Sequence, residues 1–167
     1  ISTPGWHHTG DVGHLDASGR LWVEGRLAHV LLTSQGVLTP VAAVQSAESL
    51  PEVRRAALVA VGPAGTAAPV LVIEASANTA ALEARQSASG LKRALLDRVP
   101  GARRFLIAEG VAPFELSQLV RQKVAEDTGV ELAAVLVVHE HPTDIRHNSK
   151  IDRPALGEWA SKVLAGA

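Results

Sequence analysis

The stretch that decides the fold is residues 56–74, AALVAVGPAGTAAPVLVIE, in which two apolar runs flank a cluster of strand breakers. Ala56–Val61 and Val70–Glu74 are rich in Val, Leu and Ile, a composition that favours buried β-strands. Gly62–Gly65, with the sequence GPAG, is typical of a turn, because proline interrupts a strand and glycine permits positive φ. We therefore predict a buried hairpin with strands at residues 56–61 and 70–74.

Outward from this hairpin, the apolar patterns predict one more strand and three helices. A third strand is expected at Ala134–Val138, which has the Val-rich sequence AVLVV. Apolar residues recur at helical spacing in three further segments, near residues 40–50, 116–127 and 153–164. These elements predict the α+β fold class, with a three-stranded sheet flanked by helices.

Some expectations concern individual side chains and weaker patterns. Thr39 and Asp152 stand before two of the expected helices, where each side chain would cap the helix N-terminus. A further helical spacing occurs at Leu91, Leu95 and Leu96. Because large aromatic side chains usually fill cores, we expect packing roles for Trp6, Trp22 and Trp159.

The N-terminal segment has the pattern of another β-hairpin, with strands at residues 12–15 and 20–25 and a turn at Asp16–Gly19. A two-stranded hairpin is only marginally stable alone in water, so we expect its sheet to be completed by strands outside this chain. The chain contains no Met, and its start, ISTPGW, does not resemble a signal peptide. We therefore expect a fragment of a larger protein.

Composition argues against several functions. The 167 residues include 16 Lys+Arg and 17 Asp+Glu, so the chain lacks the basic excess that favours nucleic-acid binding. The absence of Cys excludes disulfides and cysteine nucleophiles and fits a cytoplasmic location. No apolar run approaches the roughly 20 residues of a transmembrane segment. The seven His residues have no metal-ligand spacing, His139–His141 (HEH) included, so we expect no metal site.

Three motifs contain polar residues that could carry chemistry: Asp11 in TGD, Arg26 in GR and Lys150 in HNSKI. Taken alone, these residues have ordinary interpretations as a turn residue, a surface ion-pair partner and the solvated end of a loop over residues 142–150. Their joint order and spacing favour a functional interpretation. Together they resemble the C-terminal motifs of the acyl-adenylate-forming enzymes, which include acyl-CoA synthetases, peptide-synthetase adenylation domains and luciferases.

This resemblance implies two domains and a role for each motif residue. Residues 1–27 would be the last hairpin of a large AMP-binding domain, and residues 28–167 would be the small C-terminal lid domain. By match to the family motifs, Asp11 would hold the ATP ribose, and Arg26 would present its guanidinium to the nucleotide. Lys150 would be the catalytic lysine, with its ammonium between the substrate carboxylate and the α-phosphate. ATP and Mg²⁺ would be bound mainly by the large domain, so this fragment alone should be inactive.

The chain departs from the family pattern where members that transfer acyl groups to thiols have their hinge and thiol loop. At the hinge, where Asp or Lys is usual, this chain has Ala28. Residues 33–44, TSQGVLTPVAAV, match a loop resembling SGGENIxPxEIE, but Gln35 replaces the second glycine, and Ala42 and Val44 replace the glutamates. A Gln side chain at a close-approach position would narrow the pantetheine path, which argues against transfer to coenzyme A.

Residues 25–30 and 142–153 look instead like the β-lactone synthetases of bacterial olefin biosynthesis. This resemblance implies ATP-dependent adenylation of a 2-alkyl-3-hydroxy fatty acid, after which the substrate's own hydroxyl closes a β-lactone and AMP leaves. A β-lactone decarboxylase of the olefin pathway would be a partner enzyme. Two alternatives stay open: the C-terminal domain of an acyl-CoA or acyl-AMP ligase, and a non-enzymatic lid or interaction module.

Overall fold

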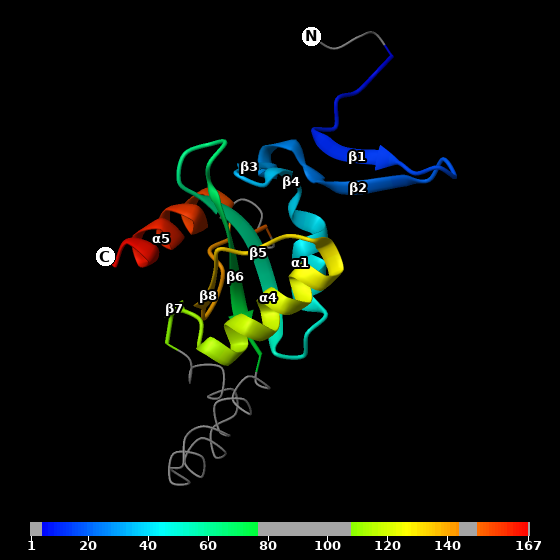
Figure 1. The fold of residues 1–167 in the computed structure, drawn as a ribbon. Helices are drawn as coiled ribbons and strands as arrows, with labels where there is room; N and C mark the ends of the chain where they lie inside the picture. Colours follow the sequence, from blue (N-terminus) through cyan, green and yellow to red (C-terminus); the bar gives the residue numbers. More distant parts are fainter. Residues whose placement is uncertain (1–4, 77–107, 144–149, 167) are drawn as a thin grey trace, which may run out of the picture.

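The computed structural model describes residues 5–76, 108–143 and 150–166. Its centre is a four-stranded mixed sheet with the strand order β5-β6-β8-β7 (Figure 1). The strands are β5 (Val53–Val61), β6 (Ala68–Ala75), β7 (Gly110–Val111) and β8 (Ala134–Val138). β6 pairs with β5 antiparallel and with β8 parallel, and β7 pairs with β8 antiparallel.

The three expected strands are confirmed as β5, β6 and β8. The two-residue edge strand β7 was not expected, because so short a pairing leaves no pattern in the sequence.

Helices cover both faces of this sheet, and all three expected helices are confirmed. One face packs against α1 (Pro40–Glu48) and α4 (Phe114–Thr128), and the other packs against α5 (Arg153–Ala165). β6 is buried on both faces because alternate side chains enter the two cores. Leu71 and Ile73 contact the α1 and α4 side, whereas Val70 and Val72 contact the α5 side. The α+β fold class is thus confirmed, with four strands instead of three.

The two expected helix caps have different outcomes. Asp152 caps α5, because its side chain accepts a hydrogen bond from the backbone N–H of Ala155 at 3.1 Å. Thr39 does stand at the N-cap position of α1, but its side chain caps nothing. The Thr39 hydroxyl instead donates to Glu24 Oε2 at 3.1 Å. The cap expected of the Thr39 side chain was wrong, because a carboxylate acceptor on a neighbouring strand takes its hydroxyl.

Two small hairpins precede the central sheet. The expected N-terminal hairpin is confirmed as β1 (Asp11–Leu15) and β2 (Leu21–Arg26), which project from the body of the molecule (Figure 1). Gly13 is required in β1, because a Cβ at that position would lie 2.3 Å from the carbonyl oxygen of Trp22. Residues 31–38 form a second hairpin, with strands β3 (Leu31–Thr33) and β4 (Gly36–Leu38).

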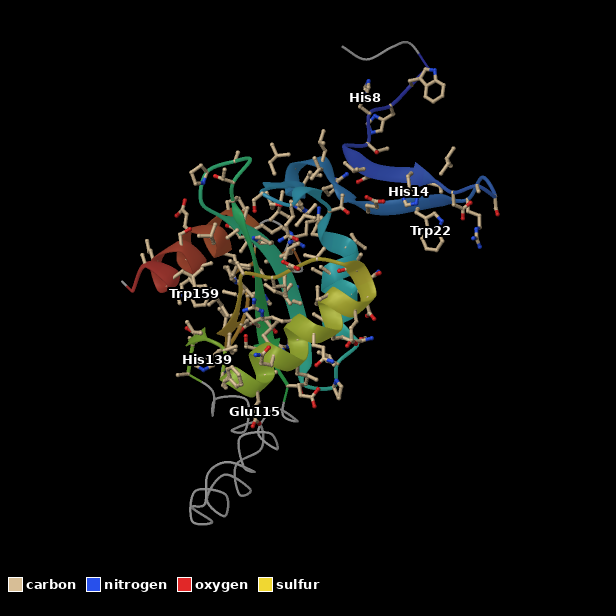
Figure 2. All side chains as sticks on the ribbon, in the orientation of Figure 1. His8, His14, Trp22, Glu115, His139 and Trp159 are labelled. Atoms are coloured by element: carbon tan, nitrogen blue, oxygen red, sulfur yellow. The ribbon has the colours of Figure 1, made fainter. Side chains whose placement is uncertain are left out.

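The packing role expected of the Trp residues is right for one of the three. Trp159 packs against the core beneath α5. Trp6 and Trp22 are 76% and 51% exposed, so the core role expected of them was wrong. Trp22 lies on the projecting hairpin (Figure 2), where its indole N–H donates to Asp16 Oδ2 at 3.0 Å.

Some expectations fall outside the described residues. The helical spacing at Leu91, Leu95 and Leu96 is one of these, and the middle of the 142–150 loop, residues 144–149, is another. Within the described ranges, no helix is both long enough and apolar enough to span a bilayer.

Candidate functional site

Asp11 and Arg26, two of the predicted site residues, are brought together by the β1–β2 ladder. They are direct cross-strand partners at the end of the hairpin that leads into the rest of the chain. Arg26 Nη1 lies 3.0 Å from Asp11 Oδ1 and also donates to the carbonyl oxygen of Thr9 at 2.6 Å. The arginine therefore ties the TGD segment to the end of β2.

The Asp11–Arg26 pair is accessible to solvent. The side chain of Asp11 is 39% exposed and that of Arg26 is 55% exposed. Hydrogen bonds from Arg26 and Thr9 lower the pKa of Asp11 below its ordinary value, so the carboxylate is ionised at neutral pH. An exposed, ionised carboxylate beside a guanidinium can accept hydroxyl hydrogen bonds while the cation attracts phosphate.

The predicted hinge residue lies immediately after this pair. Ala28 is the middle residue of a short 3-10 helix, η1 (Leu27–His29), and both residues that flank η1 are extended. A single turn between extended residues can absorb a change of φ and ψ without breaking a longer helix. Whether the chain rotates at Ala28 stays a prediction.

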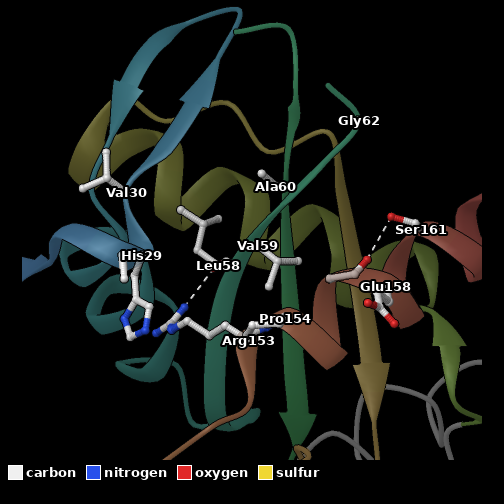
Figure 3. A pocket seen from close by; sticks show the side chains of 12 residues that line it. His29, Val30, Leu58, Val59, Ala60, Gly62, Arg153, Pro154, Glu158 and Ser161 are labelled. Atoms are coloured by element: carbon white, nitrogen blue, oxygen red, sulfur yellow. Dashed lines mark hydrogen bonds between the residues drawn. The ribbon is translucent and has the colours of Figure 1, made fainter. Parts of the chain in front are cut away.

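Ala28 also lines a cleft of about 500 Å³ between η1, β5 and the first turns of α5 (Figure 3). Within this cleft the His29 ring lies beside the guanidinium of Arg153, which donates to the carbonyl oxygen of Leu58 at 2.9 Å. Burial lowers the pKa of His29, and the positive charges of Arg153 and Arg26 lower it further. His29 is therefore neutral at pH 7, and η1 rests against the start of α5.

Lys150 lies at the other end of the sequence and immediately precedes α5. Its side chain is exposed, and among the described residues no hydrogen bond or ion pair holds its ammonium. Its neighbour Ile151 forms an isolated antiparallel bridge with Thr143, and Asp152 N–H donates to the carbonyl oxygen of Pro142 at 2.7 Å. These contacts bring the described residues on the two sides of the expected loop together, next to Lys150. The described residues place no contact between Lys150 and Asp11 or Arg26.

The structure gives Gln35 a definite position. Its side-chain amide forms two hydrogen bonds with the backbone of Glu131, one donated by Nε2 at 2.7 Å and one accepted by Oε1 at 3.1 Å. Gln35 therefore pins the β3–β4 turn to the segment between α4 and β8. The sequence alone indicated only a side chain at a glycine position and gave no sign of this partner.

A buried ionic cluster near the base of the Lys150 loop was missed in the sequence. Glu74 is 0% exposed and His141 is 2% exposed, and His141 Nδ1 lies 2.8 Å from Glu74 Oε1. Arg54 pairs with the other carboxylate oxygen. Burial raises the pKa of Glu74, but hydrogen bonds from His141 and the charges of His141 and Arg54 outweigh it and give a net lowering. The signal that could have revealed this cluster is the glutamate ending an apolar strand run.

Metal-ligating side chains do not gather in the described parts of the chain. No group of three or more His, Asp or Glu residues with a suitable arrangement is found there. The two histidines of the HEH sequence at residues 139–141 have different partners. The His139 ring lies 3.4 Å from Glu109 Oε1, whereas His141 contacts Glu74.

No protein-family model matches the chain, but its sequence is similar to that of known enzymes. An olefin β-lactone synthetase of Xanthomonas campestris pv. campestris is 33% identical over 158 residues, which cover 93% of this chain and 23% of the relative. The enzyme of the same name from Stenotrophomonas maltophilia is 32% identical over 158 residues, covering 95% and 23%. The chain thus spans about a quarter of these relatives' length, in their C-terminal part.

The fold is also similar to part of a known ligase structure. The solved structure of an anthranilate CoA ligase, AuaEII, in complex with anthranoyl-AMP matches with a TM-score of 0.62 and 18% sequence identity. That match covers 94% of this chain and 25% of the ligase chain. Both the sequence relatives and the structural neighbour match over nearly the whole of this chain and only part of their own length. Over nearly its whole length the chain is therefore similar in sequence to the C-terminal part of the olefin β-lactone synthetases and similar in fold to part of an anthranilate CoA ligase.

Proposed function

We propose that this chain is the C-terminal part of an ATP-dependent β-lactone synthetase that acts on a 2-alkyl-3-hydroxy fatty acid. The observation that carries the proposal is the 33% identity to an olefin β-lactone synthetase over 93% of the chain. The paired Asp11 and Arg26 support it, because the residues matched to the nucleotide motifs meet in space.

The proposed reaction has two steps. In the first, a carboxylate oxygen of the substrate attacks the α-phosphorus of ATP, the bond to the β-phosphate oxygen breaks, and pyrophosphate leaves. In the second, the 3-hydroxyl oxygen attacks the acyl carbon, the acyl–phosphate bond breaks, AMP leaves and the hydroxyl proton passes to solvent or a base. The products are the β-lactone, AMP and pyrophosphate. Because the nucleophile is part of the same molecule, its effective concentration is high.

Each site residue has a role in this proposal. Asp11 holds the ribose hydroxyls through its ionised carboxylate, and Arg26 keeps that carboxylate in place while facing the nucleotide. Lys150 places an ammonium between the substrate carboxylate and the α-phosphate, where negative charge builds up in the transition state. The exposure of Lys150 supports this role, because its ammonium is free to reach a ligand held by another domain.

The boundary between the two domains is proposed at residue 27. Both hydrophobic cores are built from residues of the chain from Leu31 onward, among those described. The β1–β2 hairpin exposes an apolar strip, with Leu15, Leu21 and Val23 each 58% or more exposed. A strip of this kind is typical of a surface that another part of the protein covers. We propose the large AMP-binding domain as that part, with Ala28 as the hinge.

The same proposal leaves no need for a thiol acceptor. Gln35 occupies the position of a loop glycine and is fixed to the backbone of Glu131 by two hydrogen bonds. Ala42 and Val44 provide no carboxylates where the thiol-transferring relatives have glutamates. These features support closure by the substrate's own hydroxyl in preference to transfer to coenzyme A.

Mg²⁺ would accompany ATP by neutralising phosphate charge. Among the described residues, no three metal-ligating side chains lie together. We therefore place the ion with the large domain and assign no step to it here. The strained lactone product would be consumed by a β-lactone decarboxylase, and we propose the cytoplasm as the place of both reactions.

The proposal is tested by incubating the complete enzyme with ATP, Mg²⁺ and a 2-alkyl-3-hydroxy fatty acid, with and without coenzyme A. We expect β-lactone, AMP and pyrophosphate in equal amounts without coenzyme A, detected by mass spectrometry and nucleotide chromatography. A matched acid without the 3-hydroxyl should give the acyl-adenylate and no lactone. Product formation that depends strictly on coenzyme A and yields a thioester would overturn the proposal.

A further inference from the structure

A buried histidine, His141, directly precedes the expected loop before Lys150 and contacts a buried glutamate, Glu74. Glu74 is near the end of β6 and His141 follows β8, the parallel neighbour of β6 in the sheet. Both side chains are 0% exposed. Glu74 belongs to the series of β6 residues that faces α5, together with Val70 and Val72. The pair therefore lies on the side of the sheet where Lys150 and α5 follow.

The contacts of His141 fix both its backbone and its ring. Its backbone N–H donates to Glu74 Oε1 at 2.7 Å, and ring Nδ1 lies 2.8 Å from the same oxygen. Ring Nε2 lies 3.1 Å from the carbonyl oxygen of Val72. Both ring nitrogens thus lie within hydrogen-bond distance of an oxygen atom. These three contacts to residues of β6 fix the orientation of the His141 side chain.

The cluster of Glu74, His141 and Arg54 is not expected to contribute much to the free energy of folding. A carboxylate in the interior loses its hydration, and the attraction of its partners often does no more than offset that cost. Apolar side chains of similar volume would fill the same space at least as well. The geometry that the pair imposes is its distinctive contribution, because charged hydrogen bonds have narrow preferences of distance and angle.

What the pair orients is the base of the Lys150 loop. Pro142, the residue after His141, accepts the Asp152 N–H at 2.7 Å, and Thr143 bridges to Ile151. Asp152 in turn caps α5. Lys150 is therefore joined to a fixed helix on one side and, through Ile151 and Thr143, to the anchored His141 on the other.

We propose that His141 and Glu74 are positioning residues for Lys150, holding the base of its loop so that the ammonium reaches the reacting phosphate. The inference rests on the proposed adenylation and deepens it. An error of about 1 Å in the position of a catalytic group can lower a rate by roughly 100-fold. Disturbing the pair should therefore slow adenylation without weakening ATP binding at Asp11 and Arg26.

The experiment is a double-mutant cycle in the complete enzyme, followed by pyrophosphate release at saturating ATP and acid. His141→Leu removes both ring contacts, and His141→Asn retains a donor close to the position of Nδ1. We expect His141→Leu to lower kcat by about 10- to 100-fold with the KM for ATP unchanged, and His141→Asn to recover part of the loss. In a Lys150→Ala background, His141→Leu should cause no further loss, because the residue acts through Lys150.

A matched control is offered by Ser46, a buried polar residue on the opposite face of the sheet. Its hydroxyl donates to Asp127 Oδ2 at 2.7 Å between α1 and α4. Ser46→Ala should lower thermal stability and leave kcat unchanged, which separates positioning from general destabilisation. If the enzyme with His141→Leu does not fold, Glu74→Ala, which removes the acceptor of both His141 contacts to Glu74, takes its place in the cycle and should give the same pattern of kcat.

The outcomes distinguish this inference from the proposed function. Full additivity of His141→Leu and Lys150→Ala, or an equal loss of kcat with Ser46→Ala, would overturn the positioning role while leaving adenylation by Lys150 intact. An unchanged rate with Lys150→Ala would overturn the assignment of the catalytic lysine itself, and the positioning role would fall with it.

Discussion

The guanidinium of Arg26 contacts the carboxylate of Asp11 across the β1–β2 ladder, with 3.0 Å between Nη1 and Oδ1. The two residues are 15 positions apart, and the antiparallel register makes them direct partners. The same arginine binds the carbonyl oxygen of Thr9, so the TGD segment is held to the last residue of β2. One side chain thus organises both motifs that we assign to the nucleotide.

Asp11→Ala tests the nucleotide role of this pair. The change removes the proposed ribose acceptor, and a hydrogen bond to a charged group is worth about 1.5–3 kcal/mol. We therefore expect the KM for ATP to rise roughly 10- to 100-fold in steady-state kinetics of the complete enzyme. Glu126→Ala, which removes an exposed carboxylate of α4, serves as the control and should leave the KM unchanged. Equal KM values for the two variants would contradict the role of Asp11.

Glu74 predicts a specific pH dependence of stability. Its pKa in the folded protein lies below the ordinary 4.5, so between these values the folded state binds fewer protons than the unfolded state. The stability that Glu74 contributes is present above about pH 4.5 and is lost as the pH falls through the folded-state pKa. In thermal unfolding of the 167-residue chain, Glu74→Gln should flatten the decline of Tm below that pH.

Asp127→Asn is the matched comparison for Glu74→Gln. Hydrogen bonds from Lys123 and Ser46 lower the pKa of Asp127 as well, but this carboxylate is partly exposed. Solvent screening weakens such contacts, so the decline of Tm with pH should change less than with Glu74→Gln. A larger effect from Asp127→Asn would contradict the importance given to the buried pair.

Gln35→Ala tests the anchoring of the β3–β4 turn. The change removes both hydrogen bonds to the backbone of Glu131, and we expect a loss of about 1 kcal/mol in the free energy of unfolding, measured with urea. Gln122→Ala, which removes an exposed amide from α4, should stay within about 0.5 kcal/mol. The rate of lactone formation without coenzyme A should not change with Gln35→Ala, because the proposed reaction uses no thiol acceptor. A loss of stability with Gln35→Ala no larger than that with Gln122→Ala would contradict the anchoring role.

The main elements of the fold could be predicted because local patterns specify them. Val-rich runs and helical spacing located β5, β6, β8 and the three described helices, and DASG located the β1–β2 turn. β7 could not be predicted, since its two residues form a strand only by pairing with β8. The hydroxyl of Thr39 was assigned to its own helix because Glu24 is brought beside it only by the tertiary fold.

The candidate site divides in the same way. Asp11, Arg26 and Lys150 were predicted because they belong to short motifs that follow one another in a characteristic order, and their roles stay predictions. The structure brings Asp11 and Arg26 together. Glu74 and His141 are 67 positions apart, and no local pattern connects them. Their contact arises from the parallel pairing of β6 with β8, a pairing that sequence periodicity alone does not reveal.

Lys150→Ala in the complete enzyme is the most direct test of the central claim that this chain provides the catalytic lysine of an adenylating enzyme. Loss of one electrostatic stabiliser of the transition state should slow pyrophosphate release by about 100- to 1,000-fold. Lys162→Ala, an exposed lysine in the last turn of α5, is the control and should keep the wild-type rate. Release at the wild-type rate from the Lys150→Ala enzyme, or equal slowing by both substitutions, would contradict the claim.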